Sequence, residues 1–200
     1  MKSLHILHTE AASGWGGQEI RICQETEILL KRGHKVSVAC RTGSPLEEHC
    51  RSISDARFNF KPIPMKGLMN FGAFTALYRY INEINPDIIH THSSVDSWLG
   101  GVAGKFAGIP VVRTRHVSLP IRGFFPNHLL YSYIPEKILT SGDAISDMVK
   151  KVRCVDPQKV VSIPAGVDLC RFNPTISGSK IREEFKVKPS QPLVGKIGVI

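Results

Sequence analysis

The chain has 200 residues, of which 42% are hydrophobic, and it carries a formal net charge of +9. This length and composition support a globular protein with a sizeable core, containing one complete domain and a piece of another. No segment approaches the ~20 apolar residues that a membrane-spanning helix needs. The positive charge favours an anionic ligand or partner, which could be a nucleotide phosphate, nucleic acid or an acidic membrane surface.

The cysteines and the first ten residues indicate where the protein works. The five cysteines lack a C-x-x-C pair, and an odd number cannot all pair within one chain. We expect reduced thiols in a reducing compartment. Residues 1–10 are typical of a polar-interrupted strand rather than a signal peptide. A cytoplasmic location follows as the expectation.

Short apolar segments alternate with helical ones along the chain. The predicted strands are residues 4–8, 35–40, 58–64, 87–92, 111–116, 137–141 and 160–164. Alternation of this kind predicts parallel strands joined by crossover helices. Several strands are almost wholly apolar, which is typical of strands covered on both faces. We therefore predict an α/β fold, with a doubly wound, mostly parallel Rossmann-like sheet and helices on both faces.

Helical periodicity is clear in residues 71–84, 99–107 and 145–152, where apolar side chains recur on one face. Residues that typically end helices follow the predicted helical segments. Gly33, Asn85 and Gly108 each come directly after a predicted helix.

The character of the chain changes after residue 164. Turn-like residues lead into a short polar stretch, then a helical run over residues 181–185 and a strand-like run over residues 192–200. We interpret residues 1–173 as an N-terminal Rossmann-like domain. Residues 174–200 then form a linker and the first strand of a second, similar domain, whose remainder lies beyond this chain.

The loop after the first strand carries two adjacent glycines, Gly16 and Gly17, at the start of a helix. Backbone N–H groups at such a place approach a phosphate closely, and the helix dipole favours its charge. The alternative is a tight turn that needs glycine only for its backbone angles. A nicotinamide-binding motif fits worse because the spacing is G-x-G-G. Arg41, at the end of the second strand, could still bind the 2′-phosphate of NADP, so an NADP site stays an alternative.

His90 and His92 lie at the end of the fourth strand, two residues apart and therefore on one face. Zinc sites usually need three or four protein ligands, and no third is near in sequence. We therefore expect no metal. In our interpretation one histidine packs beneath the next helix, the other lines a cleft, and Ser94 or Asp96 caps that helix.

The end of the fifth strand places Thr114 and His116 on one face, with Arg113 and Arg115 on the other. His116 thus emerges at the mouth of the predicted cleft, where an imidazole can exchange protons or donate to a sugar hydroxyl. A structural role is the alternative. The following loop, residues 117–128, combines aromatic residues with Arg122, a pattern that suits either a membrane interface or core packing.

Four segments together resemble family 4 of the retaining glycosyltransferases: residues 16–19, 87–92, 114–116 and 163–174. The last is the most specific, because the family commonly has I-P-N-G-V-D followed by F-x-P. Ala165 replaces the usual asparagine. The resemblance covers essentially the whole chain and implies two Rossmann-like domains that face each other across a cleft, the GT-B architecture.

The resemblance also implies roles for individual residues. Gly16 and Gly17 would lie against the donor diphosphate, and His116 would be the catalytic residue beside the transferred sugar. The acceptor-binding residues would be Gln18, His92, Arg115 and Arg122. Most donor contacts would belong to the second domain, so this half alone would be inactive, and no obligatory metal or other cofactor is expected.

The implied function is retaining transfer of a sugar from a nucleotide-sugar donor to a polysaccharide, lipopolysaccharide or lipid-linked acceptor of the cell envelope. Peripheral contact with the anionic inner face of the membrane is a further expectation. Two alternatives stay open, a nucleotide-sugar epimerase on the same fold and a non-catalytic binding module. Nucleic acid is not expected as a partner because no recognition helix or stacking motif supports it.

Overall fold

The computed structural model describes residues 2–121, 125–153 and 155–195. Its strands and helices alternate as the sequence predicts. The strands are β1 His5–Glu10, β2 Lys35–Arg41, β3 Phe58–Ile63, β4 Ile88–Thr91, β5 Val111–Arg115, β6 Lys137–Thr140 and β7 Val160–Ser162. The helices are α1 Gly17–Lys31, α2 Pro45–Ser52, α3 Phe71–Ile84, α4 Ser94–Ala107, α5 Phe125–Tyr131, α6 Asp143–Lys150, the 3-10 helix η1 Pro157–Lys159 and α7 Ser179–Glu184.

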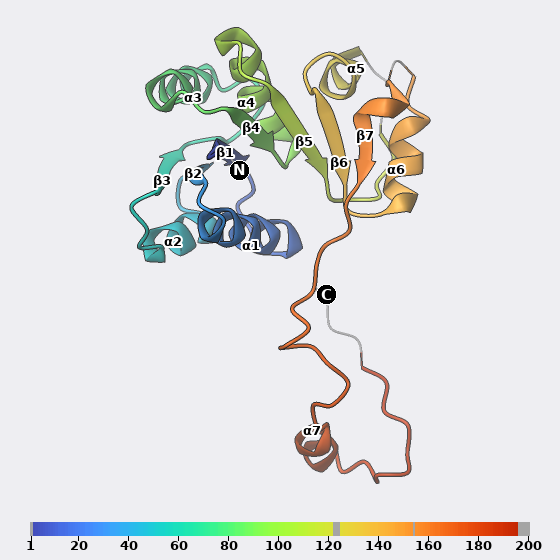
Figure 1. The fold of residues 1–200 in the computed structure, drawn as a ribbon. Helices are drawn as coiled ribbons and strands as arrows, with labels where there is room; N and C mark the ends of the chain where they lie inside the picture. Colours follow the sequence, from blue (N-terminus) through green and yellow to red (C-terminus); the bar gives the residue numbers. More distant parts are fainter. Residues whose placement is uncertain (1, 122–124, 154, 196–200) are drawn as a thin grey trace. The chain divides into compact units, whose positions relative to one another are not determined.

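The seven strands form one sheet in the order β3-β2-β1-β4-β5-β6-β7, and every neighbouring pair is parallel. The predicted Rossmann-like fold is thus confirmed (Figure 1). The chain builds outward from β1 to β3, then returns to place β4 on the other side of β1. The strand order therefore reverses between β1 and β4, and open α/β sheets bind ligands at the carboxyl side of such a switch point.

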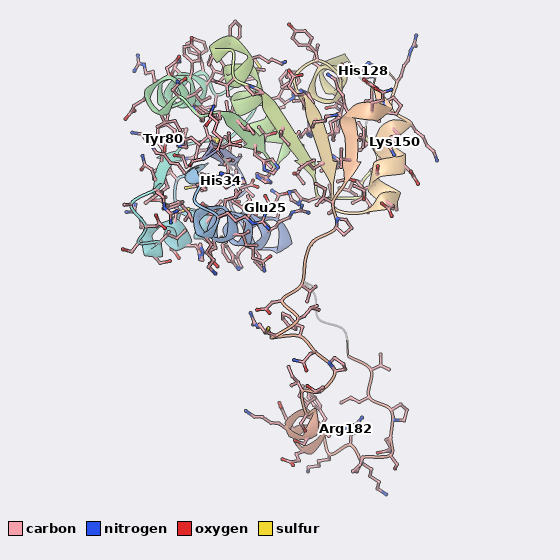
Figure 2. All side chains as sticks on the ribbon, viewed as in Figure 1. Glu25, His34, Tyr80, His128, Lys150 and Arg182 are labelled. Carbon is pink, nitrogen blue, oxygen red and sulfur yellow. The ribbon has the colours of Figure 1, made fainter. Side chains whose placement is uncertain are left out.

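Helices cover both faces of the sheet. In Figure 1, α3 and α4 lie on one side of the sheet, and α1 and α2 on the other. The larger apolar cluster packs beneath α3 and α4, around Leu7, Leu77 and Ile89. A smaller cluster around Ile22 and Leu46 packs under α1 and α2. Side chains fill the space between the sheet and both helix layers (Figure 2).

Helix α4 approaches the sheet closely because it carries glycines on its buried face. A Cβ atom on Gly104 would lie 2.8 Å from Ile89 Cδ1 and 2.9 Å from Val111 Cγ2. One on Gly101 would lie 2.7 Å from Ile134 Cγ2. A Cβ atom at either position therefore requires the neighbouring side chains to shift.

The predicted helix ends are confirmed. Asn85 and Gly108 take left-handed conformations, with φ of 42° and 72°, and close α3 and α4. Two short α-helices, α2 and α5, and the 3-10 helix η1 were not predicted. Helix α2 begins with Pro45 after Ser44, whose hydroxyl accepts a hydrogen bond from Glu47 N. Helix α5 starts at residue 125, inside the segment that we expected to remain a loop to residue 128.

Residues 1–165 form one compact unit, and residues 166–200 form a second. In the second unit, α7 agrees with the predicted helical run. Residues 192–195 are not in a strand, and the rest of the strand predicted over 192–200 lies outside the described residues. The domain boundary at residue 173 stays a prediction. In the part of the chain that the structure describes, none of the helices is both long and apolar enough to cross a membrane.

Candidate functional site

The residues singled out in the sequence come from the carboxyl ends of three strands, β1, β4 and β5, which are neighbours around the switch point. A small pocket of about 160 Å³ opens there. Its lining includes Gln18 from the start of α1, His92 from the end of β4, and Arg115 and His116 from the end of β5. Segments far apart in the sequence therefore meet at one edge, as predicted.

The glycine pair begins α1. Gly16 is the N-cap, and its N–H donates to the Glu19 carboxylate at 2.7 Å, so this amide already has a partner. Gly17 is the first helical residue and is exposed. A Cβ atom added to Gly17 would meet nothing within 4 Å. The open space above Gly17 leaves room for a ligand to approach the backbone closely.

Glu10, at the end of β1, is a site residue that sequence reasoning missed. Its carboxyl is fully buried, accepts a hydrogen bond from Ala12 N at 2.7 Å, and contacts the side-chain amide of Gln18. Burial, reinforced by the nearby charge of Asp96, raises the pKa of Glu10 to about 8. Glu10 therefore holds Gln18 in position beside the pocket.

His92 and His116 are joined in the pocket wall. His92 Nδ1 lies 3.1 Å from His116 Nε2, and the two rings stack with centroids 5.4 Å apart. Burial and the charge of Arg21 lower the pKa of His116 to about 4. The imidazole is therefore neutral near pH 7, which favours hydrogen bonding to a sugar hydroxyl over proton exchange.

The two arginines of β5 lie on the opposite face from His116, as the alternation predicts. Arg113 is buried against the Tyr131 ring, with its guanidinium carbon 4.1 Å from the ring centroid. Arg115 donates to Tyr131 Oη at 2.8 Å and to the Leu119 carbonyl, and it also lines the pocket. Arg122, the remaining predicted acceptor-binding residue, lies outside the described residues.

Asp96 organises the start of α4. It is fully buried and accepts hydrogen bonds from Thr9 Oγ1 at 2.9 Å and from the amides of His92 and Ser93 at 2.8 and 2.7 Å. The predicted capping role of Asp96 is therefore confirmed, whereas Ser93 rather than Ser94 is the N-cap. Burial raises the pKa of Asp96 despite these bonds.

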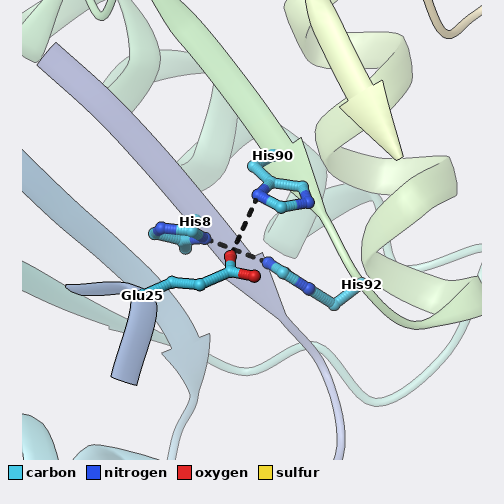
Figure 3. Close-up of side chains that lie close together, drawn as sticks. All are labelled: His8, Glu25, His90 and His92. Atoms are coloured by element: carbon cyan, nitrogen blue, oxygen red, sulfur yellow. Dashed lines mark hydrogen bonds and ion pairs between the residues drawn. The ribbon is translucent and has the colours of Figure 1, made fainter. Parts of the chain in front are cut away.

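Of the two histidines at the end of β4, His92 lines the pocket as expected, whereas His90 packs against Glu25 of α1 rather than beneath α4. The His90 ring lies between Thr114, which its Nε2 approaches to 2.6 Å, and Glu25 on α1. His8 on β1 pairs directly with His90 in the sheet register. The structure thus brings together His8, Glu25, His90 and His92, which no local sequence pattern connects (Figure 3).

The fold and the pocket together define a Rossmann-like α/β domain with a pocket at the switch point of a parallel sheet. The sequence matches the model of glycosyltransferase family 4 over residues 15–171. The chain therefore belongs to glycosyltransferase family 4, and it corresponds to the N-terminal domain of its GT-B members.

Individual proteins agree with this assignment. The chain is 27% identical to the UDP-Gal:alpha-D-GlcNAc-diphosphoundecaprenol alpha-1,3-galactosyltransferase of Escherichia coli, covering 92% of this chain and 51% of that protein. A Rickettsia africae glycosyltransferase superposes with a TM-score of 0.73 at 21% identity, over 96% of this chain and 52% of its own. Anabaena HepE in complex with UDP-glucose superposes with a TM-score of 0.72 at 15% identity, over 92% of this chain and 50% of the HepE chain. The chain thus spans about half the length of these relatives.

Proposed function

We propose that this chain is the acceptor-side half of a retaining glycosyltransferase. In this proposal the pocket beside His116 receives the reacting sugar, and the opening above Gly17 receives the donor diphosphate. The single observation that carries it is the convergence of Gln18, His92 and His116 on one pocket at the switch point. The pocket is small, which suits a half-site completed by a second domain.

The proposed chemistry is departure of a nucleoside diphosphate from the donor sugar. Negative charge develops on the leaving phosphate oxygens, and preorganised N–H groups stabilise such charge. The amides of Gly17 and Gln18 are in the first turn of α1, where no helix carbonyl is available to them. Neutral His116 would hold a hydroxyl of the transferred sugar, and we propose no obligatory metal in the transfer step.

The proposed acceptor is a glycan or a lipid-linked sugar, and the name of the E. coli relative gives a lipid-linked sugar. Arg115 lines the pocket and supplies positive charge for a phosphate of such an acceptor. We further propose that the protein works in the cytoplasm, at the inner face of the membrane, on cell-envelope polysaccharide or lipopolysaccharide. The free thiols of Cys23, Cys40, Cys50 and Cys170 are consistent with a reducing compartment.

The donor part of the proposal is tested by titrating the ¹⁵N-labelled chain with UDP-glucose and following its amide resonances. We expect weak binding, with the largest shifts at Gly17, Gln18 and His116. A Gly17→Ala substitution should weaken binding at least about tenfold, or ~1.4 kcal/mol, because the added methyl group occupies the phosphate position. The fold should be unaffected, since that methyl group meets no protein atom within 4 Å.

Gly14→Ala is the matched control, because Gly14 belongs to the same loop and its Cβ would also meet nothing within 4 Å. Equal binding by both variants would contradict the assigned phosphate position. Tight, stoichiometric binding to the 200-residue chain would contradict the half-site. Conversion of the UDP-sugar to an epimer without acceptor, by a protein that includes the second domain, would favour the epimerase alternative.

A further inference from the structure

Four metal-ligating side chains converge beneath the pocket from three different elements. His8 comes from β1, His90 and His92 from β4 and its end, and Glu25 from the middle of α1. The register pairs His8 with His90, and strand alternation puts His92 on the same face as His90. Glu25 reaches this face from the covering helix, and all four side chains point toward one another in Figure 3.

The distances suit a four-coordinate ion. One ligand atom from each residue can be chosen so that all four lie within 4.8 Å of one another. His8 Nδ1 lies 3.0 Å from His92 Nε2, and His90 Nδ1 lies 3.6 Å from Glu25 Oε2. In a tetrahedral zinc site with bonds of about 2.0–2.1 Å, neighbouring ligand atoms are ~3.3 Å apart. The two observed separations fall on either side of this value.

In metal sites the second nitrogen of a ligand histidine is usually hydrogen bonded, and this holds for His90 and His92, whereas His8 Nε2 is buried without a hydrogen-bond partner among the described residues. His92 Nδ1 lies 3.1 Å from His116 Nε2, and His90 Nε2 lies 2.6 Å from Thr114 Oγ1. The other Glu25 oxygen accepts from Arg21 Nε at 2.7 Å.

A hydrogen-bond network alone explains the cluster less well. His90 Nδ1 and Glu25 Oε2 lie 3.6 Å apart, which is longer than a normal hydrogen bond. If His90 donates through Nε2 to Thr114, then Nδ1 presents a lone pair to a carboxylate oxygen. A cation between them turns this repulsion into two favourable contacts.

We propose that His8, Glu25, His90 and His92 form a structural zinc site. Imidazole nitrogens and a carboxylate oxygen are ligands that zinc accepts. The ion would tie α1 to β1 and β4. Coordination through His92 Nε2 leaves the proton on Nδ1, so His92 donates to His116 Nε2 and fixes the orientation of the pocket imidazole.

The test uses the untagged 200-residue chain, stripped of metal with EDTA and titrated with Co²⁺ as a spectroscopic substitute for Zn²⁺. We expect one equivalent of Co²⁺ to bind with the intense visible bands of tetrahedral coordination, and Zn²⁺ to remove those bands. Zn²⁺ should also raise the Tm of the stripped chain, because it binds the folded state.

The variant Glu25→Gln keeps the side-chain volume at a position that is only partly buried, so it should fold. Its Zn²⁺ affinity should fall at least about tenfold. Loss of a residue that only contacts a metal ligand usually costs about that much, and loss of a ligand should cost no less. Glu27→Gln, on the exposed side of the same helix, is the control and should bind as the wild type does. Absence of tetrahedral bands, or equal affinity in both variants, would overturn the zinc site and leave a buried imidazole network.

Discussion

At the scale of single residues, the buried carboxyl of Glu10 has the strongest consequence for the pocket. It contacts the side chain of Gln18 directly, and its pKa is raised to about 8 from 4.5. The folded protein therefore retains a proton on Glu10 at neutral pH, while the unfolded chain has already lost it. Deprotonation leaves an uncompensated charge in the interior, next to Asp96.

This difference predicts how stability depends on pH. Between about pH 4.5 and 8 the folded state binds more protons than the unfolded state, so the contribution of Glu10 to stability falls as the pH rises. In the variant Glu10→Gln, residue 10 cannot ionise. The free energy of unfolding of this variant should therefore rise relative to that of the wild type as the pH increases through this window. Urea unfolding of both proteins, in buffers that contain EDTA, measures the difference.

Glu48→Gln is the control for this comparison, because Glu48 is exposed on α2. Its unfolding free energy should follow that of the wild type at every pH. Parallel curves for the wild type and Glu10→Gln would show that Glu10 is already ionised in the folded protein at low pH.

At the scale of elements, the close approach of α4 to the sheet makes Gly104 a sensitive position. Gly104→Ala gains ~1 kcal/mol in helix propensity, but its Cβ would lie within 3 Å of Ile89 and Val111. Overpacking of this kind costs about 1–3 kcal/mol, so we expect net destabilisation. Denaturant unfolding at constant pH checks the sign.

The matched substitution is Gly72→Ala on α3. Gly72 is exposed, and its Cβ would meet only the Asn70 side chain, at 3.6 Å. No overpacking opposes the gain in helix propensity at this position, so we expect the substitution to stabilise the protein by about 0.5–1 kcal/mol. If both variants were stabilised, α4 would have to sit further from the sheet than the structure places it.

Local pattern was sufficient to predict all seven strands and the principal helices, since each has its own periodicity or stop signal. It also predicted that the glycine-led start of α1 and His116 lie at one edge, because parallel strands end on the same side. Local sequence pattern did not predict that His8 and Glu25 lie beside His90 and His92. Their proximity to His90 depends on which strands pair and in which register, and these are decided by packing across the whole sheet.

Short helices were the other omission. Helix α2 has only eight residues, too few for periodicity to be distinctive, yet Ser44 followed by Pro45 is a readable helix start. Helix α5 is shorter still and follows an aromatic loop. In both, the signal lies in the first residues rather than in a repeating pattern.

At the scale of the whole molecule, the net charge of +9 predicts attraction to anionic surfaces. Vesicle sedimentation measures this binding. We expect the chain to sediment with anionic liposomes at low salt and to be released as the salt concentration rises, because screening weakens surface attraction. Arg122→Glu and Phe124→Ser should each reduce the bound fraction.

Lys2→Glu provides the comparison for Arg122→Glu, since it makes the same charge change at an exposed position outside the proposed contact loop. An equal loss in both variants would indicate attraction by overall charge. Unchanged binding in the two loop variants would remove the support for a membrane contact by residues 117–128.

The outermost strands of the sheet have a consequence for colloidal behaviour. Pro62 in β3 has no N–H to offer, Lys61 beside it is exposed, and β7 at the opposite margin has only three residues. A strand from another molecule would therefore find few backbone partners and a positive charge. We therefore expect the sheet to resist lateral growth into larger assemblies.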